Sequence, residues 1–83
     1  MSTHILLFTQ SGCVSCEMMK IFLEAKRILF EERDMSDDPG ARRELLETYH
    51  SSTTPTVVVF TPGGAEVIEG FDLERLDQFL SAA

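Results

Sequence analysis

The spacing of apolar and polar positions alternates between strand-like and helix-like periods along the first half of the chain. His4–Thr9 is a mostly apolar run of strand length, and Phe30–Met35 is a second, less regular one. Apolar residues recur every three or four positions, as in a helix, over Val14–Leu29 and Gly40–Tyr49. This half therefore predicts a β-α-β-α order, in which Ser36–Pro39 caps and begins the second helix.

The second half of the chain predicts a hairpin and one more helix. Thr56–Thr61 is the strongest strand signal, and Ala65–Glu69 returns as its antiparallel partner after a Pro-Gly-Gly turn. Asp72 is a good N-cap for an amphipathic helix with apolar residues at Leu73, Leu76, Phe79 and Leu80. The full order, β-α-β-α-β-β-α, predicts an α/β protein with a thioredoxin-like layout: a four-stranded mixed sheet flanked by helices on both faces.

The same spacing indicates which side of each early helix faces the sheet. For the first helix we expect the apolar side to consist of Met18, Met19, Phe22, Leu23 and Ala25. For the second helix the residues expected to point inward are Ala41, Leu45 and Leu46. Together with the apolar strands, these two sets make up the predicted core.

Length and charge limit the possible functions. The 83 residues, 43% of them hydrophobic and 25% charged, are enough for a single globular domain, residues 1–83, of modest stability. A net charge of -7 argues against nucleic acid and anionic membranes as partners. No apolar run approaches the ~20 residues of a membrane span, and the first apolar run has no signal-peptide features. We expect a cytoplasmic protein and a monomer.

The two cysteines, Cys13 and Cys16, are the main candidates for chemistry. A two-residue loop between them constrains the unfolded chain very little, so a disulfide there serves stability poorly. Cys13 falls where the first strand ends and the first helix begins, and the free amides and dipole at that helix end favour a thiolate. Cysteines in such places have pKa values of about 3.5–7.5 instead of about 8.5. Cys16 follows one turn later on the same helix face, where a disulfide can open and close.

A metal site is the alternative use of this pair. Zinc needs two further ligands beyond one CxxC pair, and the candidates are His4, His50 and the carboxylates. The two histidines lie in different predicted elements, and the chain has no second CxxC. We therefore expect no metal ligands, although an iron–sulfur or zinc module and a redox-inert binding domain stay open as alternatives.

Pro55 is the second informative position. A proline at the start of a core-like strand removes a backbone donor, and it either begins the strand or forms a cis bond in a tight turn. In the predicted layout this position lies beside the turn that carries Cys13. The backbone of Thr54 would then be free to pair with an extended segment of a disulfide-containing partner.

Three segments resemble the glutaredoxin family in order and spacing: Cys13-Val14-Ser15-Cys16, Thr53-Thr54-Pro55 and Gly70-Phe71-Asp72. The resemblance covers the whole chain and is strongest to the small redoxins of the NrdH type, which reduce ribonucleotide reductase. It implies a dithiol–disulfide oxidoreductase in which Cys13 is the nucleophile, Cys16 the resolving cysteine and Pro55 a cis-proline. Protein disulfides would be its substrates, without a bound cofactor.

The chain departs from glutathione-using members of that family at several positions. Gln10 stands where those proteins usually carry Lys or Arg, and Val14–Ser15 stands where they carry Pro-Tyr. His50–Ser51 stands where they often carry a glycine followed by a basic or amide residue. Each missing charge-assisted contact is worth about 1.5–3 kcal/mol, which predicts weak use of glutathione as a co-substrate. Electrons would then come from thioredoxin reductase, with glutathione as the alternative donor. The candidate substrate-binding positions are Gln10, Thr54, Pro55, Gly70, Phe71 and Asp72; Phe71 either contacts a partner or braces the last helix.

Overall fold

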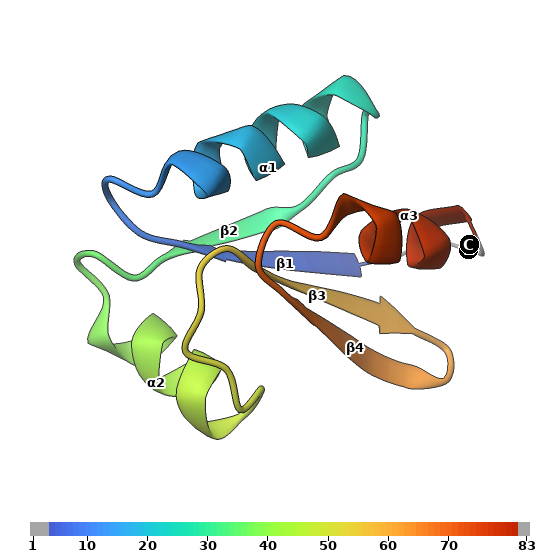
Figure 1. The fold of residues 1–83 in the computed structure, drawn as a ribbon. Helices are drawn as coiled ribbons and strands as arrows, with labels where there is room; N and C mark the ends of the chain where they lie inside the picture. Colours follow the sequence, from blue (N-terminus) through green and yellow to red (C-terminus); the bar gives the residue numbers. More distant parts are fainter. Residues whose placement is uncertain (1–3, 82–83) are drawn as a thin grey trace.

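A computed structural model describes residues 4–81, which form a four-stranded sheet with three helices (Figure 1). The strands are β1 (His4–Thr9), β2 (Glu31–Asp34), β3 (Thr56–Thr61) and β4 (Gly64–Glu69). The helices are α1 (Val14–Ala25), α2 (Pro39–Glu47) and α3 (Leu73–Ser81). The element order and the mixed sheet confirm the predicted thioredoxin-like α/β fold.

β1 and β3 are the two central strands of the sheet, whose order is β2-β1-β3-β4. β1 pairs with β2 in parallel and with β3 antiparallel, and β3 and β4 form the predicted hairpin. In the β1–β3 register Phe8 lies opposite Thr56. The carboxyl end of β1 and the amino end of β3 therefore meet at one edge of the molecule.

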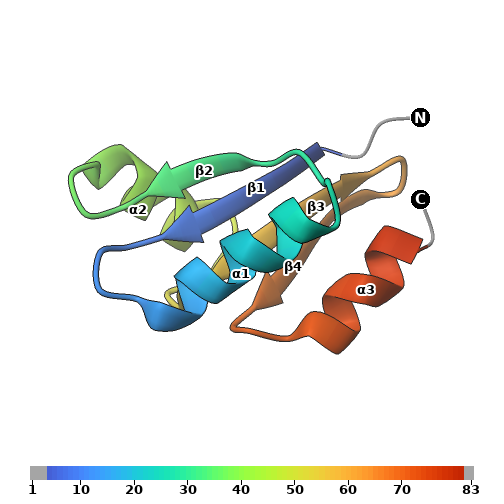
Figure 2. The same cartoon turned by 90° about the horizontal axis from the view of Figure 1, so that it is seen from above.

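Each face of the sheet has its own hydrophobic core. α1 and α3 cover one face, and α2 covers the other (Figures 1 and 2). The first core joins strand residues to α1 and α3, and its buried members are Ile5, Leu7, Met19, Leu23, Val57, Val59, Ile68 and Leu76. The second joins the opposite strand face to α2 through Leu6, Phe8, Met35, Ala41, Leu45 and Val58. Alternation along β1 and β3 supplies both cores, because successive side chains point to opposite faces.

The end of α1 differs from the prediction, which extended this helix to Leu29. The helix ends at Ala25, and Arg27 adopts a left-handed backbone with φ 57°. The amide of Ile28 donates to the carbonyl of Leu23 at 2.9 Å, and that of Arg27 donates to Glu24 at 3.0 Å. This is the hydrogen-bond pattern of a Schellman motif, which usually has glycine where Arg27 stands. Because no glycine marks this turn, the sequence pattern predicted a helix end four residues too late.

The predicted buried faces of the helices are partly wrong. Met18 and Leu46 are each 47% exposed, and Ala25 is exposed as well. Each helix packs on the sheet through one side only, so the buried part of α1 narrows to Cys16, Met19 and Leu23. Two adjacent apolar residues in a helix point 100° apart, and here only one of each pair faces the sheet. The second helix begins at Pro39 with Asp38 as its N-cap.

No helix among residues 4–81 is long and apolar enough to cross a membrane.

Two residues of α1 test how much the first core stabilises the fold. Leu23 is fully buried, whereas Ile21 is 64% exposed on the same helix. Leu23→Ala should lower the free energy of unfolding by about 2–5 kcal/mol, because it removes buried methyl groups and leaves a cavity. Ile21→Ala is the matched control and should change it by less than about 0.5 kcal/mol. Urea unfolding followed by circular dichroism measures both; equal effects would contradict the packing described here.

Candidate active site

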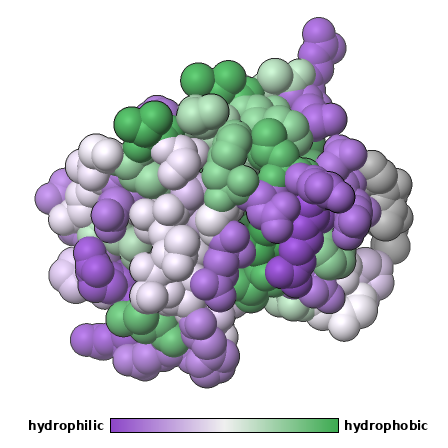
Figure 3. Space-filling model, in the orientation of Figure 1, coloured by the Kyte–Doolittle hydropathy of each residue, from purple (hydrophilic) through white to green (hydrophobic). Residues whose placement is uncertain are grey.

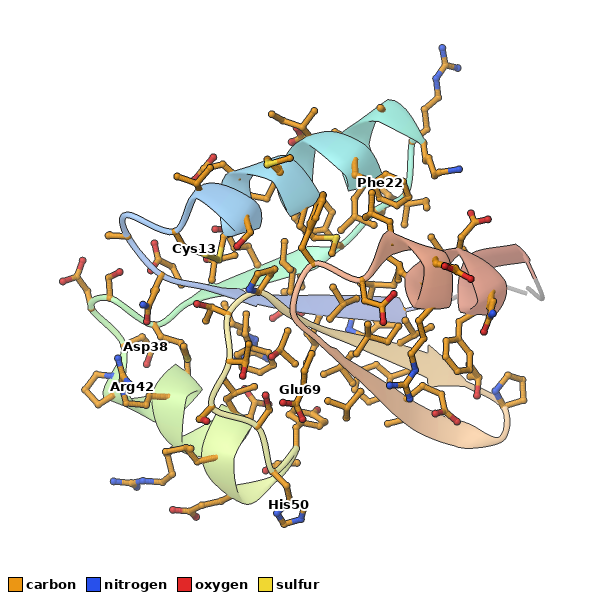
Figure 4. The ribbon with its side chains drawn as sticks, in the orientation of Figure 1. Cys13, Phe22, Asp38, Arg42, His50 and Glu69 are labelled. Carbon is orange, nitrogen blue, oxygen red and sulfur yellow. A yellow bond between two sulfur atoms is a disulfide. The ribbon has the colours of Figure 1, made fainter. Side chains whose placement is uncertain are left out.

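Cys13 lies in the turn that joins β1 to α1 (Figure 4). Its backbone is extended, its amide donates to the carbonyl of Gln10 at 3.3 Å, and it is the N-cap of α1. Gly12 precedes it with φ +77°, a conformation that side-chain-bearing residues rarely adopt. The tight turn therefore depends on this glycine and places Cys13 at the positive end of the α1 dipole.

Cys13 and Cys16 form a disulfide, and the two sulfurs have different surroundings. Cys16 is 1% exposed, whereas Cys13 is half-buried. The amide of Cys16 donates to Sγ of Cys13 at 3.1 Å, and Oγ of Ser15 lies 3.6 Å from the same sulfur. These groups stabilise a negative charge on Cys13 when the pair is reduced. The buried Cys16 sulfur has no comparable access to solvent.

Thr54 and Pro55 lie at the same edge of the sheet as the disulfide. The Thr54–Pro55 peptide bond is cis, as the resemblance implied. The ladder between β1 and β3 reaches Thr56, so Thr54 lies just beyond it and is partly exposed. The carbonyl of Pro55 accepts the amide of Gly70 at 2.8 Å, which brings the segment after β4 to this edge.

The remaining candidate positions differ in what their side chains do. The carboxylate of Asp72 accepts the amide of Arg75 at 3.1 Å, which confirms it as an N-cap. Phe71 is 38% exposed and follows Gly70, whose φ of +79° turns the chain out of β4. Gln10 is exposed and holds the Cys13 turn through its carbonyl. The topology thus gathers all three predicted segments at one edge.

A buried hydroxyl network supports the loop before Pro55, and the sequence pattern did not predict it. Ser51 is 3% exposed, and its hydroxyl lies 3.0 Å from that of Thr56. The Thr56 hydroxyl also donates to the carbonyl of Thr53, whose amide donates to Ser51 at 3.3 Å. Ser51 therefore uses its side chain inside the protein and offers no charge to a ligand. Only the run of four hydroxyl residues, 51–54, hinted at this network.

A second network holds the loop before Cys13. The amide of Ser11 donates to the hydroxyl of Ser36 at 2.6 Å, and the two hydroxyls lie 2.8 Å apart. Ser36 is placed in turn by Asp34, whose carboxylate accepts the Ser36 amide at 2.9 Å. This amide, and after it the Ser36 hydroxyl, holds the pKa of Asp34 below its usual value of 3.8. The end of β2 is thereby tied to the active-site turn.

Lys20 connects the active-site helix to the edge strand. Its Nζ lies 3.0 Å from a Glu17 carboxylate oxygen and 3.4 Å from one of Glu32. The other contact of Glu32 is the buried hydroxyl of Thr9, which donates to it at 2.7 Å. Hydrogen bonding to Glu17 is the main cause that raises the pKa of Lys20 above 10.5, against the effect of its partial burial. The network fixes α1 over β1 and β2.

Among residues 4–81, no group of three or more His, Cys, Asp or Glu side chains lies close enough together to hold a metal ion. The disulfide edge instead presents one accessible sulfur, a free stretch of backbone at Thr54 and an exposed aromatic ring. A family model for glutaredoxin matches residues 5–61, which include the CxxC pair and the cis-proline. The chain belongs to the glutaredoxin family. This glutaredoxin-family protein is a thiol–disulfide oxidoreductase with a Cys13–Cys16 redox pair.

Solved structures agree with this assignment. The thioredoxin-like protein BC3987 is 42% identical, with a TM-score of 0.79 over 89% of this chain and 96% of its own. Glutaredoxin 1 from Francisella tularensis, solved with cacodylate, is 22% identical, with a TM-score of 0.73 over 96% and 99% of the two chains. Thioredoxin O2 from Arabidopsis thaliana is 21% identical, with a TM-score of 0.67 over 98% and 74%. The last two share the fold. No curated protein matches the sequence significantly.

The tie between Asp34 and Ser36 predicts a pH effect in this glutaredoxin-family protein. Because folding lowers the Asp34 pKa below 3.8, its carboxylate adds stability that is complete above that pH. The contribution is lost as the pH falls through the lower folded value. An NMR titration should give a midpoint below 3.8 in the wild type. Ser36→Ala keeps the backbone amide but loses the hydroxyl, so the Asp34 midpoint should rise part of the way toward 3.8. A wild-type Asp34 midpoint at 3.8 would contradict the bond between Asp34 and Ser36.

Proposed function

We propose that the protein reduces protein disulfides, with Cys13 as the attacking thiolate and Cys16 as the resolving thiol. The observation that carries this assignment is the difference between the two sulfurs. Cys13 is partly exposed and receives the Cys16 amide at 3.1 Å, while Cys16 is 1% exposed. A thiolate that is both accessible and stabilised attacks first, because the thiolate is the reactive form.

The exchange proceeds in two balanced steps. The Cys13 thiolate attacks one sulfur of the substrate disulfide, forms a mixed disulfide and releases the other substrate sulfur as a thiolate that takes a proton. Cys16 then loses its proton and attacks the Cys13 sulfur, which releases the second substrate thiol and closes the Cys13–Cys16 disulfide. Two electrons pass from the cysteine pair to the substrate. Oxidised protein therefore needs a separate reductant.

The backbone around the cis-proline suits the substrate's chain. Thr54 lies beyond the β1–β3 ladder and is partly exposed, so an extended segment beside the substrate cysteine can pair with it as a short added strand. Gly70 and the 38% exposed Phe71 border the same edge through the bond from Gly70 to Pro55. These positions would bind the main chain of the substrate segment, and the surrounding surface would recognise the substrate's side chains.

Thioredoxin reductase is the electron source that the site favours over glutathione. Glutathione carries two carboxylates, and the two positions where glutathione users carry basic or amide groups offer them no charge here: Gln10 is neutral and the Ser51 hydroxyl is buried in an internal network. The resemblance to redoxins of the NrdH type supports the same source, with ribonucleotide reductase as the candidate protein substrate.

Two serine variants test the cysteine roles. Cys13→Ser should reduce insulin disulfide reduction by dithiothreitol to the uncatalysed rate, because no attacking thiolate remains. Cys16→Ser should still attack and should accumulate a mixed disulfide with the substrate, visible by mass spectrometry. Both variants should fold, since a two-residue disulfide loop adds little stability. Full activity in Cys13→Ser, or a trapped adduct in that variant alone, would reverse the assignment.

The electron source is tested by NADPH consumption with one disulfide substrate and two reducing systems. We expect turnover with thioredoxin reductase and at most slow turnover with glutathione and glutathione reductase. Gln10→Lys restores the basic residue that glutathione users carry, and it should raise the glutathione-dependent rate several-fold by adding one charge-assisted contact. Fast turnover of the wild type with glutathione alone would overturn this part of the proposal.

A further inference from the structure

An exposed apolar stripe runs along the outer side of α1, starting next to the redox pair. Its residues are Val14, Met18, Ile21 and Ala25, spaced by four, three and four positions, which places them on one face of a helix. Val14 is 74% exposed, Ile21 64% and Met18 47%. Figure 3 shows apolar side chains along the upper edge of the molecule, where Figure 1 places α1.

The stripe is unusual for its size and its position. The core side of α1 is already formed by Cys16, Met19 and Leu23, so the fold does not need the opposite side to be apolar. Val14 directly follows Cys13, and Ala25, the last residue of the stripe, lies about 16 Å further along the helix axis. An extended tripeptide spans only about 10–11 Å, so the stripe extends beyond the reach of a tripeptide bound at the sulfur. Its dimensions suit a folded protein that covers Cys13 and the first two turns of α1 together.

Acidic residues border the stripe along one side. Glu17 and Glu24 are both exposed, and the chain carries a net charge of -7. Lys20 does not offset them freely, because it is held between Glu17 and Glu32. A second copy of the chain would bring the same acids against each other, which disfavours self-association through this face. A partner with an apolar patch rimmed by Lys or Arg is complementary.

We propose that this stripe is the docking surface for the NADPH-dependent reductase that reduces the Cys13–Cys16 disulfide. The inference rests on the proposed function, in which a protein supplies the electrons. The structure contains the closed disulfide, and the stripe is exposed in that oxidised form, which is the form a reductase must bind. The two reductase thiols become a disulfide as Cys13 and Cys16 become thiols, so the electrons balance. Docking along α1 holds the reductase cysteine at the Cys13 edge.

The test measures KM and kcat for reduction of the oxidised protein by thioredoxin reductase and NADPH. Met18→Ser with Ile21→Ser should raise KM roughly tenfold and leave kcat nearly unchanged, because contacts of docking and not of chemistry are lost. Reduction by dithiothreitol, which needs no docking surface, should keep the wild-type rate. Added salt should raise the wild-type KM, because it screens the acidic rim.

Two exposed leucines provide matched controls. Leu46 has the same 47% exposure as Met18 but lies on α2, across the sheet, and Leu29 is 90% exposed beyond the other end of α1. Leu46→Ser and Leu29→Ser should leave KM within twofold of the wild type. Equal increases in KM for the control and the stripe variants would overturn the proposed docking surface. An equal loss in the rate of reduction by dithiothreitol would also overturn it.

Two further results would overturn the inference without contradicting the proposed roles of the two cysteines. The first is wild-type protein that catalyses insulin reduction with dithiothreitol and accepts electrons only from glutathione. The second is a dimer in analytical ultracentrifugation that the double variant abolishes, which would assign the stripe to a second copy of the chain. Loss of insulin reduction in the wild type would instead contradict the proposed function itself.

Discussion

The pairing of β1 with β3 is the constraint on which the active site depends. β1 is buried along Ile5–Thr9 and ends in the turn that places Cys13 at the start of α1. The register that puts Phe8 opposite Thr56 brings the cis-proline to the same edge, and the hairpin partner adds Gly70 through its bond to Pro55. A one-residue slip of β3 would turn its side chains to the opposite faces of the sheet and would displace the proline loop relative to the cysteines, so the cores and the site depend on one register.

Hydroxyl groups hold the two loops that this register brings together. Ser36 binds the turn before Cys13, and Ser51 with Thr56 holds the segment before Pro55. Both networks satisfy polar groups in irregular backbone, where no ladder is available. The loops can therefore keep a defined shape beside a disulfide that opens and closes. Neither network bonds the sulfur itself, whose polar contacts among the described residues come from the Cys16 amide and the Ser15 hydroxyl.

The sequence predicted most of the fold because its signals were local and mutually consistent. Apolar runs located β1 and β3 with the observed bounds, and Asp38 and Asp72 are recognisable caps. The CxxC spacing located the redox pair for the same reason.

The features that the sequence did not reveal depend on tertiary contacts or on rare local geometry. The Schellman turn at Arg27 lacks the glycine that usually indicates such a turn in a sequence. The exposure of Met18 and Leu46 follows from how narrow a strip of each helix the sheet covers. The Ser51–Thr56 bond joins residues whose types alone are typical of any loop.

The exposure of Met18 changes how the active-site helix is interpreted. An inward Met18 would make α1 a helix with one broad buried face, and the outer residues would be solubilising. Instead α1 has two narrow apolar sides, one packed on the sheet and one in contact with solvent, separated on one flank by Glu17, Lys20 and Glu24. The inner side holds the buried Cys16, and the outer side begins next to the half-buried Cys13. Substitutions on the outer side leave the buried packing around Cys16 intact, so they can alter the docking of a protein reductant without altering the redox pair. Small thiols and protein reductants would therefore respond differently to the same surface substitutions.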